Sequence, residues 1–126
     1  RAMVDAAGRY SPPTGDMIAR ALAEAADGTL PEVTLGRLEG WAAHEAIAAA
    51  AYVFARHPDD ARAAILEGAN TIGDSDSIAT LAGALVGARV GVGGLPPDWV
   101  RDVERADVLA GLALHAFQLT ERRRRE

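Results

Sequence analysis

The 126-residue sequence contains no cysteine and no lysine, and only 5% of its residues are aromatic. The absence of cysteine excludes disulfide scaffolds, thiolate zinc sites, CxxC redox motifs and cysteine nucleophiles, and we expect a cytoplasmic protein. The scarcity of aromatic and β-branched residues disfavours β-sheets, which are enriched in both.

Alanine is abundant instead, with 28 residues, and 49% of the sequence is hydrophobic. Alanine is the best helix former, and its small side chain lets helices approach closely, so the composition predicts an all-α helical bundle. The net charge of −5 argues against broad nucleic-acid binding. The basic run at residues 122–125 is interpreted as a solvated helix end. The weakly charged stretch at residues 78–100 is no membrane span, because it holds Arg89, several glycines and two prolines.

Apolar spacing and turn residues predict where the helices lie. Residues 1–15 are expected to be an irregular lead-in, and residues 29–36 a connector broken by Pro31. The predicted helices span residues 16–26, 38–56, 58–71, 77–89, 99–104 and 106–123.

The most informative segment is Gly73-Asp74-Ser75-Asp76-Ser77, which is followed at once by an apolar helix. Helix capping alone would explain one or two such polar residues. Here four stand in a row, and we expect the following helix to be buried on all sides. Two carboxylates at its buried end would repel each other unless a cation neutralised them. Glycines at 83, 87 and 91 also predict a smooth stripe for close helix packing.

The available ligand types narrow the choice of metal. Oxygen ligands without histidine or cysteine favour magnesium, manganese or calcium over zinc. An EF-hand is excluded because Ala79 and Leu85 stand where that loop needs glycine and glutamate. An HExxH zinc site is excluded because Ala48 stands where the second histidine would be.

Residues 73–88 resemble the ADP-ribosylglycohydrolase family, whose signature is G-D-[ST]-D-[ST]-I-A followed by A-G-A-L-x-G-A. Asn70 matches the family's N-x-G-G-D pattern, whereas Ile72 replaces its first glycine. Residues 40–46 are similar to the family's Gly-aromatic-x-x-x-Glu helix start. Residues 57–60 and 95–99 resemble its connector before the metal helix and its I-P-x-x-W turn.

The resemblance implies an all-α fold that holds two divalent cations, Mg²⁺ or Mn²⁺. It implies that Asp74 and Asp76 bind the metals through carboxylate oxygens and that Ser77 binds through its hydroxyl. Ser75 is expected to bond within the loop. The implied reaction is hydrolysis of the bond between ADP-ribose and a modified side chain or a related ADP-ribosyl molecule.

The family's T-D-D motif and early glutamate are absent, and the adjacent acidic pair Asp59-Asp60 follows a proline. Residues 1–126 are therefore expected to be the C-terminal portion of a single domain, completed by a missing N-terminal half or a second chain. This chain alone is expected to be inactive. An inactive relative that binds ADP-ribose or is structural remains the alternative, and so does a purely structural helical domain with a capped turn.

Other singled-out side chains keep more than one interpretation. Trp41 is expected in the core rather than stacked on a base. Glu45 is either a partner near the metal ligands or a surface charge. His44 and His115 have no partner motif, and Arg89 is attributed to the helix dipole.

Overall fold

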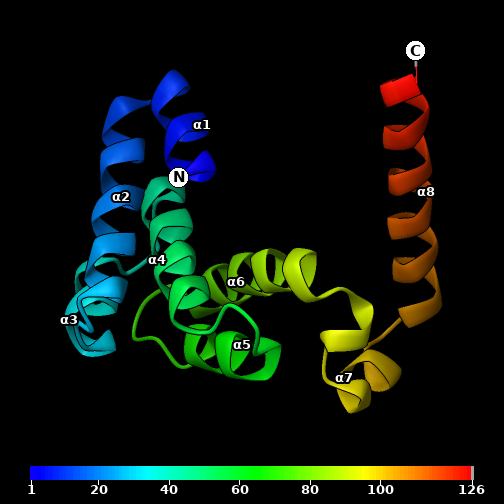
Figure 1. The fold of residues 1–126 in the computed structure, drawn as a ribbon. Helices are drawn as coiled ribbons and strands as arrows, with labels where there is room; N and C mark the ends of the chain where they lie inside the picture. Colours follow the sequence, from blue (N-terminus) through cyan, green and yellow to red (C-terminus); the bar gives the residue numbers. More distant parts are fainter. Residues whose placement is uncertain (126) are drawn as a thin grey trace. The chain divides into compact units, whose positions relative to one another are not determined.

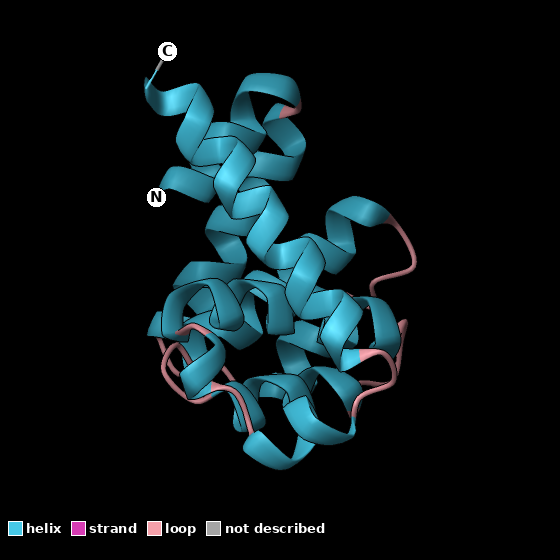
Figure 2. Cartoon of the chain, turned by 90° about the vertical axis from the view of Figure 1, so that its right-hand side faces the viewer, coloured by secondary structure: helices cyan, strands magenta, loops and turns pink. Residues whose placement is uncertain are grey.

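The computed structural model describes residues 1–125, and these contain helices but no strand (Figure 2). The all-α prediction is therefore confirmed. Residues 1–95 and 96–126 form two compact units, which are described separately. No helix in the described part of the chain is both long and apolar enough to cross a membrane.

The first unit contains six α-helices and one short 3₁₀ helix (Figure 1). Its main packed pairs are α1 with α2, α2 with α4, α4 with α6, and α5 with α6. The elements are α1 (Ala2–Tyr10), α2 (Pro12–Ala26), α3 (Pro31–Arg37), α4 (Ala43–Arg56), α5 (Ala61–Ala69), α6 (Ser75–Val90) and η1 (Val92–Gly94).

The second unit contains α7 (Pro97–Asp102) and α8 (Ala106–Arg125). Neither helix has a buried residue. Within this unit α8 leaves large apolar side chains exposed, including Leu112 and Phe117. The four arginines at positions 122–125 form its last turn, where positive charge complements the helix dipole.

Two predictions about the N-terminal region were wrong. Residues 2–10 form a helix rather than an irregular lead-in, and α2 begins at Pro12 rather than near Asp16. Pro31 begins α3 instead of breaking the chain. Pro12 and Pro31 begin helices for the same reason: proline is well tolerated in the first turn of a helix, where a backbone N–H would have no hydrogen-bond partner within the helix.

Helix α4 supplies more buried core residues than any other helix of the first unit. Tyr52 and Val53 are fully buried, and so are the alanines at positions 48–51. Such a small-residue helix lets neighbouring helices approach closely, as the composition predicts. The long predicted helix starts at Ala43 rather than at Leu38, because residues 38–42 form a non-helical segment that leads into it.

Helix α6 is not buried on all sides, contrary to the prediction. Ile78, Ala82 and Val86 are buried at a spacing of four residues, while Thr80 and Ala84 are exposed. Helices α4 and α5 cover one side of α6 only.

The glycine stripe is used differently from the prediction. Gly83 faces the side chain of Ile65, and Gly91 has open space around it. The backbones of α5 and α6 come close at Gly68, since a Cβ on Gly68 would lie 2.9 Å from the Ala79 Cα.

A polar cluster joins α2 to α3. The Glu24 carboxylate accepts hydrogen bonds from Thr34 at 2.8 Å, from Arg37 at 2.6 Å and from Arg20 at 2.8 Å. Thr34 is fully buried, so its hydroxyl needs this partner. Burial opposes ionisation of Glu24, but the hydrogen bonds from Thr34, Arg20 and Arg37 outweigh it and lower the pKa of Glu24.

Replacing Glu24 by glutamine should reduce stability at neutral pH by at most about 3 kcal/mol, the upper range for a hydrogen bond to a charged group. Because folding lowers this pKa, the stabilisation is fully present above about pH 4.5, the ordinary value, and is lost as pH falls through the lower folded value. Urea unfolding between pH 7 and pH 3 measures this. Glu32→Gln, at an exposed position of α3, is the control. If the stability of Glu24→Gln and of wild type fell equally between pH 7 and pH 3, ionised Glu24 would not be a source of the stability lost in acid.

Candidate functional site

Residues 73–77, here called the acidic loop, lie directly at the start of α6. Asp74 immediately precedes the helix, and Asp76 and Ser77 lie in its first turn, because α6 begins at Ser75 rather than at the predicted residue 77. The structure therefore brings the three predicted metal ligands to one helix end. Asp74 and Ser77 are half-buried, and Asp76 is exposed.

Helix capping does not account for both carboxylates. The Asp74 side chain makes no capping hydrogen bond, although Asp74 occupies the N-cap position of α6. The neighbouring Asp74 carboxyl group, followed by the backbone N–H groups of Asp76 and Ser77, lowers the pKa of Asp76. A cation bound by both carboxylates would offset the repulsion between their negative charges.

The loop is held against the segment that leads into α4. The N–H of Asp74 donates to the carbonyl oxygen of Glu39 over 2.7 Å, and the N–H of Ile78 donates to the carbonyl of Asp74 over 3.1 Å. Ile78 itself is fully buried. The loop therefore has a fixed backbone partner on one side and the core on the other.

An open depression of about 480 Å³ adjoins the loop. Asp76 and Ser77 are among its lining residues, which all come from the N-terminal parts of α4 and α6. The other lining residues are Ala43, Ala46, Ile47, Thr80 and Leu81. The small side chains of Ala43 and Ala46 keep part of this depression open, as a site that accepts a ligand requires.

The donor set fits hard divalent cations but forms only part of a site. Two carboxylates and a hydroxyl are oxygen ligands of the kind that Mg²⁺ and Mn²⁺ bind. No group of three histidine, cysteine, aspartate or glutamate side chains placed to hold a metal occurs within residues 1–125. The Asp59-Asp60 pair does not supply the missing ligands, because Asp60 caps α5 and Asp59 binds Arg89 at 2.8 Å.

The structure also shows where the other side chains considered in the sequence analysis lie. Trp41 is 69% exposed, so the prediction that it fills the core was wrong. Glu45 accepts a hydrogen bond from the N–H of Ala42 at 3.2 Å and so holds the start of α4. His44 and His115 are exposed. Arg89 has a specific partner in Asp59, which the dipole interpretation missed.

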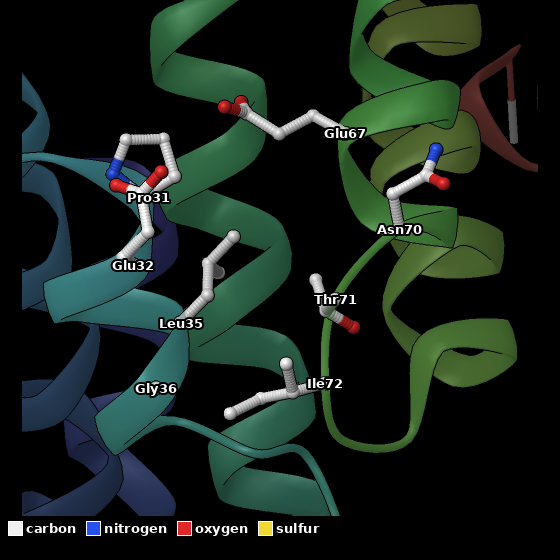
Figure 3. Close-up of a pocket in the computed structure, with 8 residues that line it drawn as sticks. All are labelled: Pro31, Glu32, Leu35, Gly36, Glu67, Asn70, Thr71 and Ile72. Carbon is white, nitrogen blue, oxygen red and sulfur yellow. The ribbon is translucent and has the colours of Figure 1, made fainter.

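A second cavity, of about 330 Å³, lies between α3 and the end of α5 (Figure 3). Ile72 extends from the loop toward α3, and the Glu67 carboxylate lies at the far end (Figure 3). Glu67 was not singled out from the sequence, yet it binds His57 at 2.8 Å and Arg56 at 3.2 Å. A lone glutamate on a helix gives no sequence signal of such a pairing.

Residues 1–126 match the profile of the family described as ADP-ribosylglycohydrolase. The sequence is also similar to the ADP-ribosylarginine hydrolase Tri1 of Pseudomonas putida (strain GB-1), with 46% identity over 54 residues. The matched stretch is 43% of this chain and 15% of that relative's length. No solved structure matches the chain.

Proposed function

Because the chain belongs to the ADP-ribosylglycohydrolase family, we propose that it forms part of a hydrolase that removes ADP-ribose from a modified side chain or a related ADP-ribosyl substrate. The observation that carries the proposal is the loop at the start of α6. It places Asp76 and Ser77 in the lining of an open depression, and the Asp74 carboxylate, two residues before Asp76, does not cap the helix.

The proposed cofactor is a pair of divalent cations, Mg²⁺ or Mn²⁺. Asp74 and Asp76 would hold them through carboxylate oxygens, and Ser77 through its hydroxyl. Bound cations would supply Lewis acidity and an activated water. The depression, which Asp76 and Ser77 help to line, would receive the ribose.

The proposed reaction is a hydrolysis. Water adds its oxygen to C1 of the ribose, the bond from C1 to the side-chain nitrogen or oxygen breaks, and the leaving atom takes up a proton. The role of Asp74 and Asp76 is to fix the geometry of this step, since correct orientation of reactants can contribute several kcal/mol to lowering a barrier.

The substrate proposed for the first test is ADP-ribosylarginine, because the similar protein of Pseudomonas putida is named an ADP-ribosylarginine hydrolase. Serine-linked ADP-ribose and ADP-ribosyl small molecules are the competing substrates. Trp41, which is exposed one residue after Gly40, is available to stack on the substrate's base.

We further propose that residues 1–126 are the C-terminal portion of a single domain, and that an N-terminal half or a second chain supplies the remaining ligands. Two observations support this. The described residues offer two carboxylates rather than a full ligand set. The exposed face of α6 and the apolar side chains of α8 are surfaces that further helices could cover. A cytoplasmic location stays a prediction from the sequence.

The test is an assay of the complete gene product on arginine-linked and serine-linked ADP-ribose with Mg²⁺ or Mn²⁺. We expect release of free ADP-ribose from the arginine linkage, loss of that release with a chelator, and recovery when the cation is restored. Absence of release from every linkage, together with retained binding of ADP-ribose, would favour the alternative of an inactive binding relative. The partial ligand set in residues 1–125 is what keeps this alternative open.

A further inference from the structure

The acidic loop rests on the backbone of a segment more than thirty residues earlier in the chain. The Asp74 N–H donates to the Glu39 carbonyl oxygen over 2.7 Å. Gly73 lies so close to Glu39 that an added Cβ would be 2.7 Å from the Glu39 Cα and closer still to its carbonyl group. Both clashing groups are backbone, so neither can turn aside as a side chain would. Only glycine allows this contact.

The next residue of the earlier segment also touches the loop. Gly40 has φ +83°, a conformation that favours glycine. A Cβ there would meet the Ile78 Cδ1 at 2.9 Å and the Asp74 Cβ at 3.5 Å. Leu38, on the other side of Glu39, is 1% exposed and belongs to the core. Residues 38–40, here called the support segment, are thus anchored themselves.

The support segment contacts the residue that precedes α6. Its carbonyl at Glu39 fixes the Asp74 peptide, and the Asp74 carbonyl then accepts the N–H of Ile78 at 3.1 Å in the first turn. The direction of the Asp74 and Asp76 side chains follows from this backbone. Ligand groups must be held to within about 0.5 Å to act together, so a small shift of the loop would separate them.

We propose that the support segment is a backbone template for the acidic loop and that Gly73 and Gly40 are positioning residues for cation binding. This inference rests on the proposed function, because it assigns the template a purpose at the proposed metal ligands. Neither glycine offers a side chain to a ligand. Each acts only by allowing the two backbones to meet.

The experiment compares two pairs of variants in the complete protein. Gly73→Ala has Gly36→Ala as its control, since a Cβ at Gly36 meets nothing within 4 Å. Gly40→Ala has Gly91→Ala as its control, because Gly91 also has a positive φ, +69°, but open space around it. Both members of the second pair therefore suffer the same kind of backbone strain, and only Gly40 touches the loop.

Two quantities are measured: Mn²⁺ affinity by calorimetric titration, and hydrogen exchange of the Asp74 amide. We expect Gly73→Ala and Gly40→Ala to weaken Mn²⁺ binding at least tenfold and to speed exchange at Asp74. The control variants should stay within twofold of wild type in both measurements. If Gly73→Ala does not fold, the Gly40 and Gly91 pair decides the question.

The two ways of failing are distinct. Wild-type protein that binds no Mn²⁺ would overturn the proposed function. Wild-type protein that binds Mn²⁺ while Gly73→Ala or Gly40→Ala binds it equally well would overturn the template alone. A loss in Gly91→Ala as large as that in Gly40→Ala would also overturn it, because general strain would then be sufficient.

Discussion

Replacing both Asp74 and Asp76 by asparagine in the complete protein is expected to abolish stabilisation by Mn²⁺ and to lower hydrolysis at least about a hundredfold. Removing a group that merely supports a metal ligand already costs 10–100-fold in affinity or activity, and these changes remove two proposed ligands themselves. Asparagine keeps the size of each side chain but not its negative charge. Thermal unfolding with and without Mn²⁺ and the ADP-ribose release assay measure the outcome.

The matched control is Asp59→Asn combined with Asp102→Asn. It removes the same two charges from exposed side chains, which bind Arg89 and Arg101. Asp59 binds Arg89 near the C-terminal end of α6. Arg89 follows Asp76 by more than twelve residues of helix, which is at least about 18 Å along the helix axis. The control should keep the Mn²⁺ response and the activity. If the Asp74 and Asp76 variant binds Mn²⁺ like wild type, the two residues are not its ligands.

Replacing Tyr52 by alanine is expected to lower the free energy of unfolding by about 3–5 kcal/mol, the range for removing a large buried aromatic side chain. Tyr52 is fully buried in α4. Its hydroxyl donates to the carbonyl oxygen of Thr29 over 2.5 Å, and the Arg56 guanidinium lies 5.6 Å from its ring centre. Burial raises the pKa of Tyr52, so the side chain stays a hydrogen-bond donor at neutral pH.

Tyr52→Phe separates the two contributions. It keeps the ring but leaves the Thr29 carbonyl without this donor, which should cost about 1–3 kcal/mol. Tyr10→Ala is the control, because Tyr10 is 92% exposed and surface substitutions stay within about 0.5 kcal/mol. Urea unfolding of the complete protein measures all three. A loss in Tyr52→Ala no larger than in Tyr10→Ala would contradict the central position of α4 in the core.

Much of the fold follows from local sequence signals. The alanine-rich composition correctly predicts an all-α chain, and the end of α2 at Ala26 and the start of α8 at Ala106 agree with the turn residues. The failures are also local. Proline and glycine near residues 8–15 and at Pro31 were interpreted as breaks, although proline in a first helical turn begins a helix.

The candidate site divides in the same way. The three oxygen-bearing residues Asp74, Asp76 and Ser77 stand together in the sequence, so their chemistry was visible in one short stretch. The role of the Glu39 carbonyl that holds them could not be predicted from the sequence. Every residue carries a backbone carbonyl, and the residue type does not show which carbonyl accepts a long-range hydrogen bond. The exposure of Trp41 was missed because an indole beside an apolar helix suits the core as well as a binding surface.

The sequence by itself determined the all-α fold class and the identity of the acidic loop, since both depend on residues that are neighbours along the chain. Only the tertiary structure decided that Gly73 is needed for a backbone contact with Glu39, that α4 lies at the centre of the core, and that one face of α6 is exposed. These features depend on which segments distant in sequence pack together. Local propensity and periodicity carry no information about that choice until the helices are in contact.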